Sequence, residues 1–141
     1  MNIYKNFLKK EHSNKIYYQL QKPYFPWFYS KHQNNKDTSY MFHLFYDGAK
    51  VNSDYFYLVE PILEKLKIKN LLHVDKLTKN LKHKTSIYYV NTNNGYTLFK
   101  NKKVKCEKNK IVIFNADQKH KAKIQTDKDI RIVININYEY N

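Results

Sequence analysis

The sequence is poor in the residues that break or cross-link a chain. Its 141 residues include two glycines, three prolines and one cysteine. A single cysteine excludes an intramolecular disulfide, and Cys106 is interpreted as an incidental residue of a lysine-rich strand. So few glycines and prolines argue against flexible linkers and low-complexity tails. We therefore expect one domain over residues 1–141, because this length with 42% apolar residues supplies one core.

Long hydrophobic runs are also missing. No apolar stretch approaches the length of a membrane span, and the first residues, MNIYKNFLKKEH, lack the apolar core of a signal peptide. The sequence therefore predicts a soluble, cytoplasmic protein with no membrane partner.

Arginine is almost absent although the chain is strongly basic. The formal net charge is +14, yet Arg131 is the only arginine among 26 lysines and arginines. The lysines are spread along the chain, together with many Asn, Ile, Tyr and Phe residues, as an AT-rich coding sequence would produce. Specific nucleic-acid binding is therefore not expected, although a basic nucleic-acid-binding module stays an alternative.

The apolar pattern predicts helices first and short strands afterwards. Helices are expected over Tyr4–Leu20 and Ser53–Lys67. A strand is expected over Tyr40–Tyr46, with His43 packed in the core. Seven further strands are expected over Leu71–Leu77, Thr85–Asn91, Tyr96–Phe99, Val104–Glu107, Ile111–Phe114, Ala122–Gln125 and Ile130–Tyr138. This order favours a mainly β (α+β) jelly roll with the two helices packed outside it.

The last strand separates an apolar face from a polar one. Alternation over Asp129–Tyr138 puts Arg131 and Val133 on one face and the isoleucines on the other. We expect the isoleucine face to meet the helices and the Arg131 face to line the interior. The planar guanidinium of Arg131 is suited to gripping a fixed carboxylate through two hydrogen bonds.

Three residues could bind a metal ion. His73 and Asp75 lie two positions apart, so a strand would present them on one side. With His120 from a later strand they would form a 2-His-1-carboxylate triad, the ligand set of non-haem Fe(II) oxygenases. Arg131 would then hold the far carboxylate of a dicarboxylate cosubstrate.

Several stretches resemble a known family. TSIYYVNTNNGYTLF from Thr85, KIVIFNADQKH from Lys110 and TDKDIRIVININY from Thr126 are similar to the Fe(II)- and 2-oxoglutarate-dependent dioxygenases. The likeness is to a compact, prolyl-hydroxylase-related set common in bacteriophage genomes. FPWFYS and MFHLFYDGAKVNSDYFYLVEPIL extend it upstream.

The resemblance implies a double-stranded β-helix (jelly roll). It also implies that His120 is an iron ligand and that Arg131 binds 2-oxoglutarate. A phage-encoded member would work in the host-cell cytoplasm.

The place of the remaining iron ligands stays open at the level of sequence. Leu71–Leu77 either contains the H-x-D motif itself or corresponds to an earlier strand of the family, in which case His73 and Asp75 only mimic the motif. His83 is a spare candidate, but Thr85 stands where a carboxylate would be needed. The expected function is a hydroxylase that uses Fe(II) and 2-oxoglutarate. The alternatives are an inactive jelly-roll relic that binds a partner, and the nucleic-acid-binding module.

Overall fold

The larger sheet organises the molecule. The structure, a computed structural model, describes residues 1–31, 39–48, 50–68 and 83–139. The larger sheet is antiparallel, with the strand order β1-β7-β4-β9. Its strands are β1 (Asn2–Tyr4), β4 (His83–Tyr89), β7 (Lys110–Asn115) and β9 (Val133–Glu139). β4 pairs with β7 on one side and β9 on the other, so it is the most enclosed strand.

A smaller antiparallel sheet has the strand order β6-β5-β8. Its strands are β5 (Tyr96–Phe99), β6 (Lys103–Lys105) and β8 (His120–Lys123). A separate two-stranded ribbon pairs β2 (Phe28–Lys31) with β3 (Ser39–Phe42).

The chain passes back and forth between the two sheets. β4 belongs to the larger sheet, β5 and β6 to the smaller, β7 to the larger, β8 to the smaller and β9 to the larger. One apolar core is built from both sheets: Ile87, Tyr89, Val112 and Phe114 from the larger sheet pack with Phe99 and Val104 from the smaller. The two sheets therefore face each other across this core.

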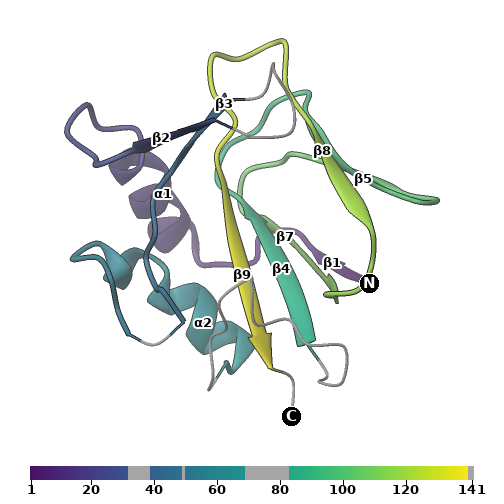
Figure 1. Cartoon of the computed structure of the whole chain (residues 1–141), viewed down its shortest axis with the longest axis horizontal. Helices are drawn as coiled ribbons and strands as arrows, with labels where there is room; N and C mark the ends of the chain where they lie inside the picture. Colours follow the sequence, from purple (N-terminus) through teal and green to yellow (C-terminus); the bar gives the residue numbers. More distant parts are fainter. Residues whose placement is uncertain (32–38, 49, 69–82, 140–141) are drawn as a thin grey trace.

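The helices cover the opposite face of the larger sheet. They are α1 (Lys10–Gln19), the 3₁₀ helix η1 (Phe56–Leu58) and α2 (Glu60–Leu66). Figure 1 shows α1 and α2 on the side of β4 and β9 away from β5 and β8. The apolar side chains of β9 pack in the same core as those of the helices, as the alternating pattern predicted. This core includes Ile16, Leu58, Ile62, Ile132, Ile134, Ile136 and Tyr138.

The expected mainly β fold with two helices is confirmed, but the first helix is shorter than predicted. It begins at Lys10, and Asn2–Tyr4 forms a strand that pairs with β7. Three residues are too few for a periodic pattern, so pairing with the exposed edge of β7 decides their conformation.

The second helix is interrupted. The predicted segment Ser53–Lys67 forms η1 and then α2, with Val59 between them. Pro61 has no N–H to donate to a preceding helical carbonyl, so it is tolerated only in the first turn of a new helix. The Ser53 hydroxyl accepts a hydrogen bond from the Tyr55 N–H at 3.0 Å, as an N-cap side chain does, but the chain continues into the short η1 and not into a long helix.

Strand boundaries differ from prediction in buried and exposed strands alike: the buried β4 spans His83–Tyr89 instead of Thr85–Asn91, and β6 spans Lys103–Lys105 instead of Val104–Glu107. The prediction for β5 is confirmed residue for residue, and β7 is one residue longer at each end than Ile111–Phe114. β8 begins two residues before the predicted Ala122, because pairing with β5 fixes this wholly exposed strand. β9 begins at Val133, so Arg131 precedes the strand, and Ile130 is 44% exposed.

The remaining predictions concern the first half of the chain. β3 ends at Phe42, short of the predicted Tyr46. His43 packs against the rings of Phe25 and Phe45, with centroids 4.6 and 4.7 Å away, but it is only partly buried, so its predicted place in the core is correct only in part. The predicted strand Leu71–Leu77 lies outside the described residues. Within the described part of the chain, no helix is long and apolar enough to cross a membrane.

Candidate functional site

A pocket of about 170 Å³ opens between the two sheets. Its polar lining comes from Thr97 on β5, His120 and Lys121 on β8, Arg131, and Asn135 on β9. Ile87, Ala122 and Val133 supply apolar walls. His120 and Arg131, which the sequence analysis identified as candidate site residues, therefore line one pocket.

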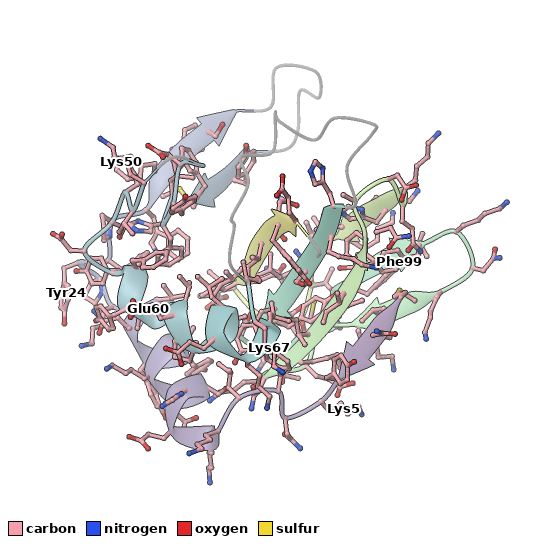
Figure 2. All side chains as sticks on the ribbon, turned by 90° about the horizontal axis from the view of Figure 1, so that it is seen from below. Lys5, Tyr24, Lys50, Glu60, Lys67 and Phe99 are labelled. Carbon is pink, nitrogen blue, oxygen red and sulfur yellow. The ribbon has the colours of Figure 1, made fainter. Side chains whose placement is uncertain are left out.

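His120 is the first residue of β8 and is held from two sides. Its ring stacks on Phe99, with centroids 5.9 Å apart, and meets Phe114 edge-on at 4.7 Å. Phe99, labelled in Figure 2, lies in the strand-rich part of the molecule, opposite Tyr24. Both phenylalanines are buried in the core between the sheets, so they give the exposed imidazole a fixed support.

The hydrogen bond of His120 identifies its free nitrogen. Nδ1 lies 3.0 Å from the carbonyl oxygen of Gln118. A carbonyl oxygen only accepts, so Nδ1 carries the proton and Nε2 of the neutral ring keeps its lone pair. Metal-binding histidines usually donate their other ring N–H in this way, which orients the ring and raises its basicity.

Arg131 is held by Cys106, which the sequence did not connect with it. Its Nε–H donates to Cys106 Sγ at 3.2 Å, which leaves the two terminal amino groups of the guanidinium for a ligand. Cys106 is buried, and burial raises the pKa of its thiol, although Arg131 opposes this shift. The thiol is therefore neutral at pH 7 and accepts the hydrogen bond through sulfur. The interpretation of Cys106 as incidental was wrong.

Gly95 makes room for the side chain of Arg131. A Cβ atom at Gly95 would lie 3.2 Å from Arg131 Cδ, and closer still to the Lys123 carbonyl oxygen at 2.9 Å and Asn93 Oδ1 at 2.7 Å. Two of these contacts are shorter than real Cβ contacts allow. A larger residue at position 95 would therefore displace the turn or the arginine.

The backbone on both sides of Arg131 is held by Asn91. Its Nδ2 donates to the Ile130 carbonyl at 2.8 Å, and its Oδ1 accepts from the Ile132 N–H at 2.9 Å. Asn91 is itself buried, where such hydrogen bonds are costly to lose. The side chain thus fixes the peptide units that flank Arg131. This clamp was missed, and the only local signal is an asparagine two residues after a strand that ends in buried tyrosines.

Asn94, in the turn after β4, ties the loop before Arg131 to the sheets. Its Oδ1 accepts from the Thr126 N–H at 2.8 Å, and its own backbone N–H donates to Asp127 at 2.9 Å. The segment Asn91–Gly95 therefore supports Arg131 from the turn as well as from the strand.

The polar floor of the pocket continues along β4 and β9. Tyr89 donates its hydroxyl to Thr97 Oγ1 at 2.7 Å, and burial raises the pKa of this tyrosine, so it stays a neutral donor. Thr85 donates to Asn137 at 2.8 Å, and Thr85 shares the face of β4 that carries Ile87. This face is therefore polar towards the start of β4.

His83, the spare candidate ligand, lies on the same face of β4. Its side chain is buried, and its Nε2 has no hydrogen-bond partner among the described residues. It does not line the pocket with His120.

His73 and Asp75 lie outside the described residues, so the structure gives no geometry for the full triad. Within the described ranges, no group of three or more His, Cys, Asp or Glu side chains could hold a metal ion.

The charges around the pocket select for anions. Lys121 and Arg131 line it, and no carboxylate does so among the described residues. A cationic wall with polar groups at its floor attracts negatively charged ligands. The arrangement can bind a small carboxylate with the guanidinium and present a free imidazole nitrogen in the same pocket.

Comparisons of the chain with protein-family models, with curated proteins and with solved structures found no match.

Proposed function

We propose that this protein is a 2-oxoglutarate- and Fe(II)-dependent oxygenase, a hydroxylase with a double-stranded β-helix fold. The observation that carries the proposal is the meeting of His120 and Arg131 in one pocket. The sequence resemblance implies that His120 is an iron ligand and that Arg131 binds 2-oxoglutarate. They come from different parts of the chain, and the sequence alone did not require them to line a common cavity.

The path of the chain supports the proposed fold. From β4 to β9 the strands alternate between two facing antiparallel sheets. Jelly rolls are double-sheet structures of antiparallel strands. The described edge of β9 away from β4, and that of β8 away from β5, are where further strands of such a fold would pair.

The residues of the pocket fit the proposed groups. His120 has its Nδ1 proton committed to Gln118, so Nε2 is the ligand nitrogen. His73 and Asp75, which precede β4 in the chain, would complete the iron site. A site of these three residues would leave coordination positions open for a cosubstrate and oxygen. Bound Fe(II) and 2-oxoglutarate would supply the oxidising power for hydroxylation.

Arg131 would bind the carboxylate of 2-oxoglutarate that is remote from the metal. Its Nε bond to Cys106 turns the terminal amino groups into a preset fork, and a fork matches the two oxygens of a carboxylate. Thr97 adds a hydroxyl at the same wall, oriented by Tyr89. The chain's own residues thus bind and orient the cosubstrate, while the apolar walls limit water around it.

Two substitutions separate iron binding from cosubstrate binding. Arg131→Lys keeps the charge but replaces a two-point grip with a single ammonium, so the affinity for 2-oxoglutarate should fall about 10- to 100-fold. Iron uptake should survive. His120→Ala should remove iron uptake without unfolding the chain, because the side chain is exposed.

Anaerobic titration calorimetry with Fe(II) and then 2-oxoglutarate measures both effects, and circular dichroism controls for folding. A His120→Ala variant that takes up iron like the wild type would refute the assigned ligand. An Arg131→Lys variant with unchanged affinity for 2-oxoglutarate would refute the assigned grip.

A further inference from the structure

The outer face of the smaller sheet collects lysines that are far apart in the sequence. In the register of the sheet, Tyr96 on β5 lies between Lys105 on β6 and Lys123 on β8. Two residues further along β5, Leu98 lies between Lys103 and Lys121. Alternate residues of a strand share a face, so these six side chains form one surface, which we call the lysine face.

The lysine face is solvent-exposed and is not neutralised by the described residues. All four lysines are exposed. The strands β5, β6 and β8 contain no acidic residue, and none of these lysines forms an ion pair with a described residue. By contrast, the buried Lys110 of the larger sheet is paired with Glu107 at 2.5 Å. Figure 1 shows β5 and β8 on the side of the molecule away from the helices, so the helices leave this face open.

The centre of the lysine face is apolar rather than charged. Tyr96 and Leu98 are half-buried and lie on the middle strand. The Lys103 ammonium lies 3.8 Å from the centroid of the Tyr96 ring, so a cation and an aromatic ring share one position. Neighbouring strands are about 4.8 Å apart, so the lysines along β6 and the lysines along β8 form two rows about 10 Å apart, one on each side of β5.

We propose that the lysine face binds single-stranded nucleic acid without reading its sequence. Rows of lysine suit the phosphate backbone, because ammonium groups act as mobile point charges and release counterions from it. The apolar row between them suits bases, which stack on aromatic side chains in sequence-tolerant binding. Only an unpaired strand offers bases and phosphates together to one flat face. The lysine face lies on the outer side of the smaller sheet and meets the pocket only at Lys121, which lines both.

The register explains why the sequence did not reveal this surface. The lysines were interpreted as scattered, and along the chain they are: Lys103 and Lys121 lie 18 positions apart (121 − 103). They meet only because β5 pairs with β6 on one edge and β8 on the other. Overall charge still contributes attraction, so the experiment must separate the lysine face from net charge.

Two glutamine variants with equal charge make this separation. The face variant replaces Lys103, Lys105 and Lys123, and it keeps Lys121 because that residue also lines the pocket. The control variant replaces Lys9, Lys10 and Lys50, which are also exposed. Each removes three positive charges, so a difference between them reports position and not net charge. A fluorescent mixed-sequence single strand of about 16 nucleotides is titrated at several salt concentrations, with its duplex form in parallel.

The wild type should bind the single strand with a slope of log K against log salt near −2.8 or steeper, the value expected of about four phosphate contacts. The face variant should lose most of this slope and at least tenfold in affinity at low salt, while the control variant stays close to the wild type. Tyr96→Ala should weaken binding about fivefold or more with little change in slope.

Equal losses in the two glutamine variants would overturn the proposal, because diffuse charge would then explain the binding. Tighter binding of the duplex, with no effect of Tyr96→Ala, would overturn the assignment to single strands. Competition by polyglutamate that is as strong as competition by the unlabelled single strand at the same charge concentration would show that charge alone is recognised, and would overturn the role of the apolar centre.

Discussion

Replacing Asn91 with alanine should damage both the fold and the pocket, because Asn91 holds the backbone on either side of Arg131. The substitution removes a donor to the Ile130 carbonyl and an acceptor for the Ile132 N–H. The Ile132 N–H is buried, and an unsatisfied buried group costs about 1–3 kcal/mol. Ile130 is exposed, so water can replace part of the bond to its carbonyl, and this loss should be nearer 1 kcal/mol.

The free energy of unfolding should therefore fall by about 2–4 kcal/mol, which lowers the melting temperature by roughly 5–15 °C in a chain of this size. Chemical denaturation and thermal melts measure the two quantities. Asn101→Ala is the matched control, because Asn101 is exposed in the β5–β6 turn. The folded variant should also bind 2-oxoglutarate less tightly. A loss below about 1 kcal/mol, no larger than an average hydrogen bond contributes, would refute the clamp.

Three further perturbations test supports of the site and of the fold. Cys106→Ala should weaken 2-oxoglutarate binding about fivefold with iron binding unchanged. Cys106→Ser should bind 2-oxoglutarate more tightly than Cys106→Ala, because the serine oxygen can also accept the hydrogen bond from Arg131. Calorimetry that shows both variants equal to the wild type would count against a positioning role of Cys106. Asn109→Ala should lower the free energy of unfolding by about 3–5 kcal/mol. The buried Asn109 side chain bonds both the N–H and the carbonyl of Leu8 and accepts from Tyr88, and its backbone has a positive φ that disfavours alanine. A denaturation midpoint equal to that of Asn101→Ala would contradict this prediction.

The third perturbation is Glu107→Gln, which tests a pH dependence. The hydrogen bond from Lys110 lowers the pKa of the Glu107 carboxyl, and Lys5 adds to the shift. A folded pKa below the unfolded one contributes stability that is present above the unfolded value and is lost as the pH falls below about 5. Denaturation between pH 3 and about 6 should therefore show a shallower loss of stability in the variant than in the wild type, and identical profiles would show that this ion pair adds nothing.

Local patterns predicted that the buried strands exist, but not all of their ends: β4 begins and ends two residues earlier than predicted. β5 and β7 carry β-branched and aromatic side chains at strand spacing. Because these side chains are needed for packing, the ends of the two strands can be recognised in the sequence. β8 reads His-Lys-Ala-Lys and is exposed throughout, so only pairing with β5 makes it a strand. The break before α2 depends on Pro61. Its effect on a helix follows from its covalent structure, but its exact position in the turn is set by packing.

The candidate site was predictable in its charged residues and not in their supports. Arg131 stood out as the only arginine, and His120 through its place between two apolar strands. Cys106 and Asn91 were not found, because each acts on Arg131 or its neighbours from 25 or more positions away. Such contacts follow from strand register and turn geometry, which depend on the whole fold.

The measurement that tests the proposed function most directly is the affinity of the wild-type protein for 2-oxoglutarate with and without Fe(II), taken anaerobically. Because the cosubstrate would occupy open coordination positions of the iron, each should raise the affinity for the other by the same factor. We predict about one Fe(II) per chain and clearly tighter binding of 2-oxoglutarate when iron is present. Binding of neither, or binding of 2-oxoglutarate that ignores iron, would contradict the account and leave the chain as a binding protein without this chemistry.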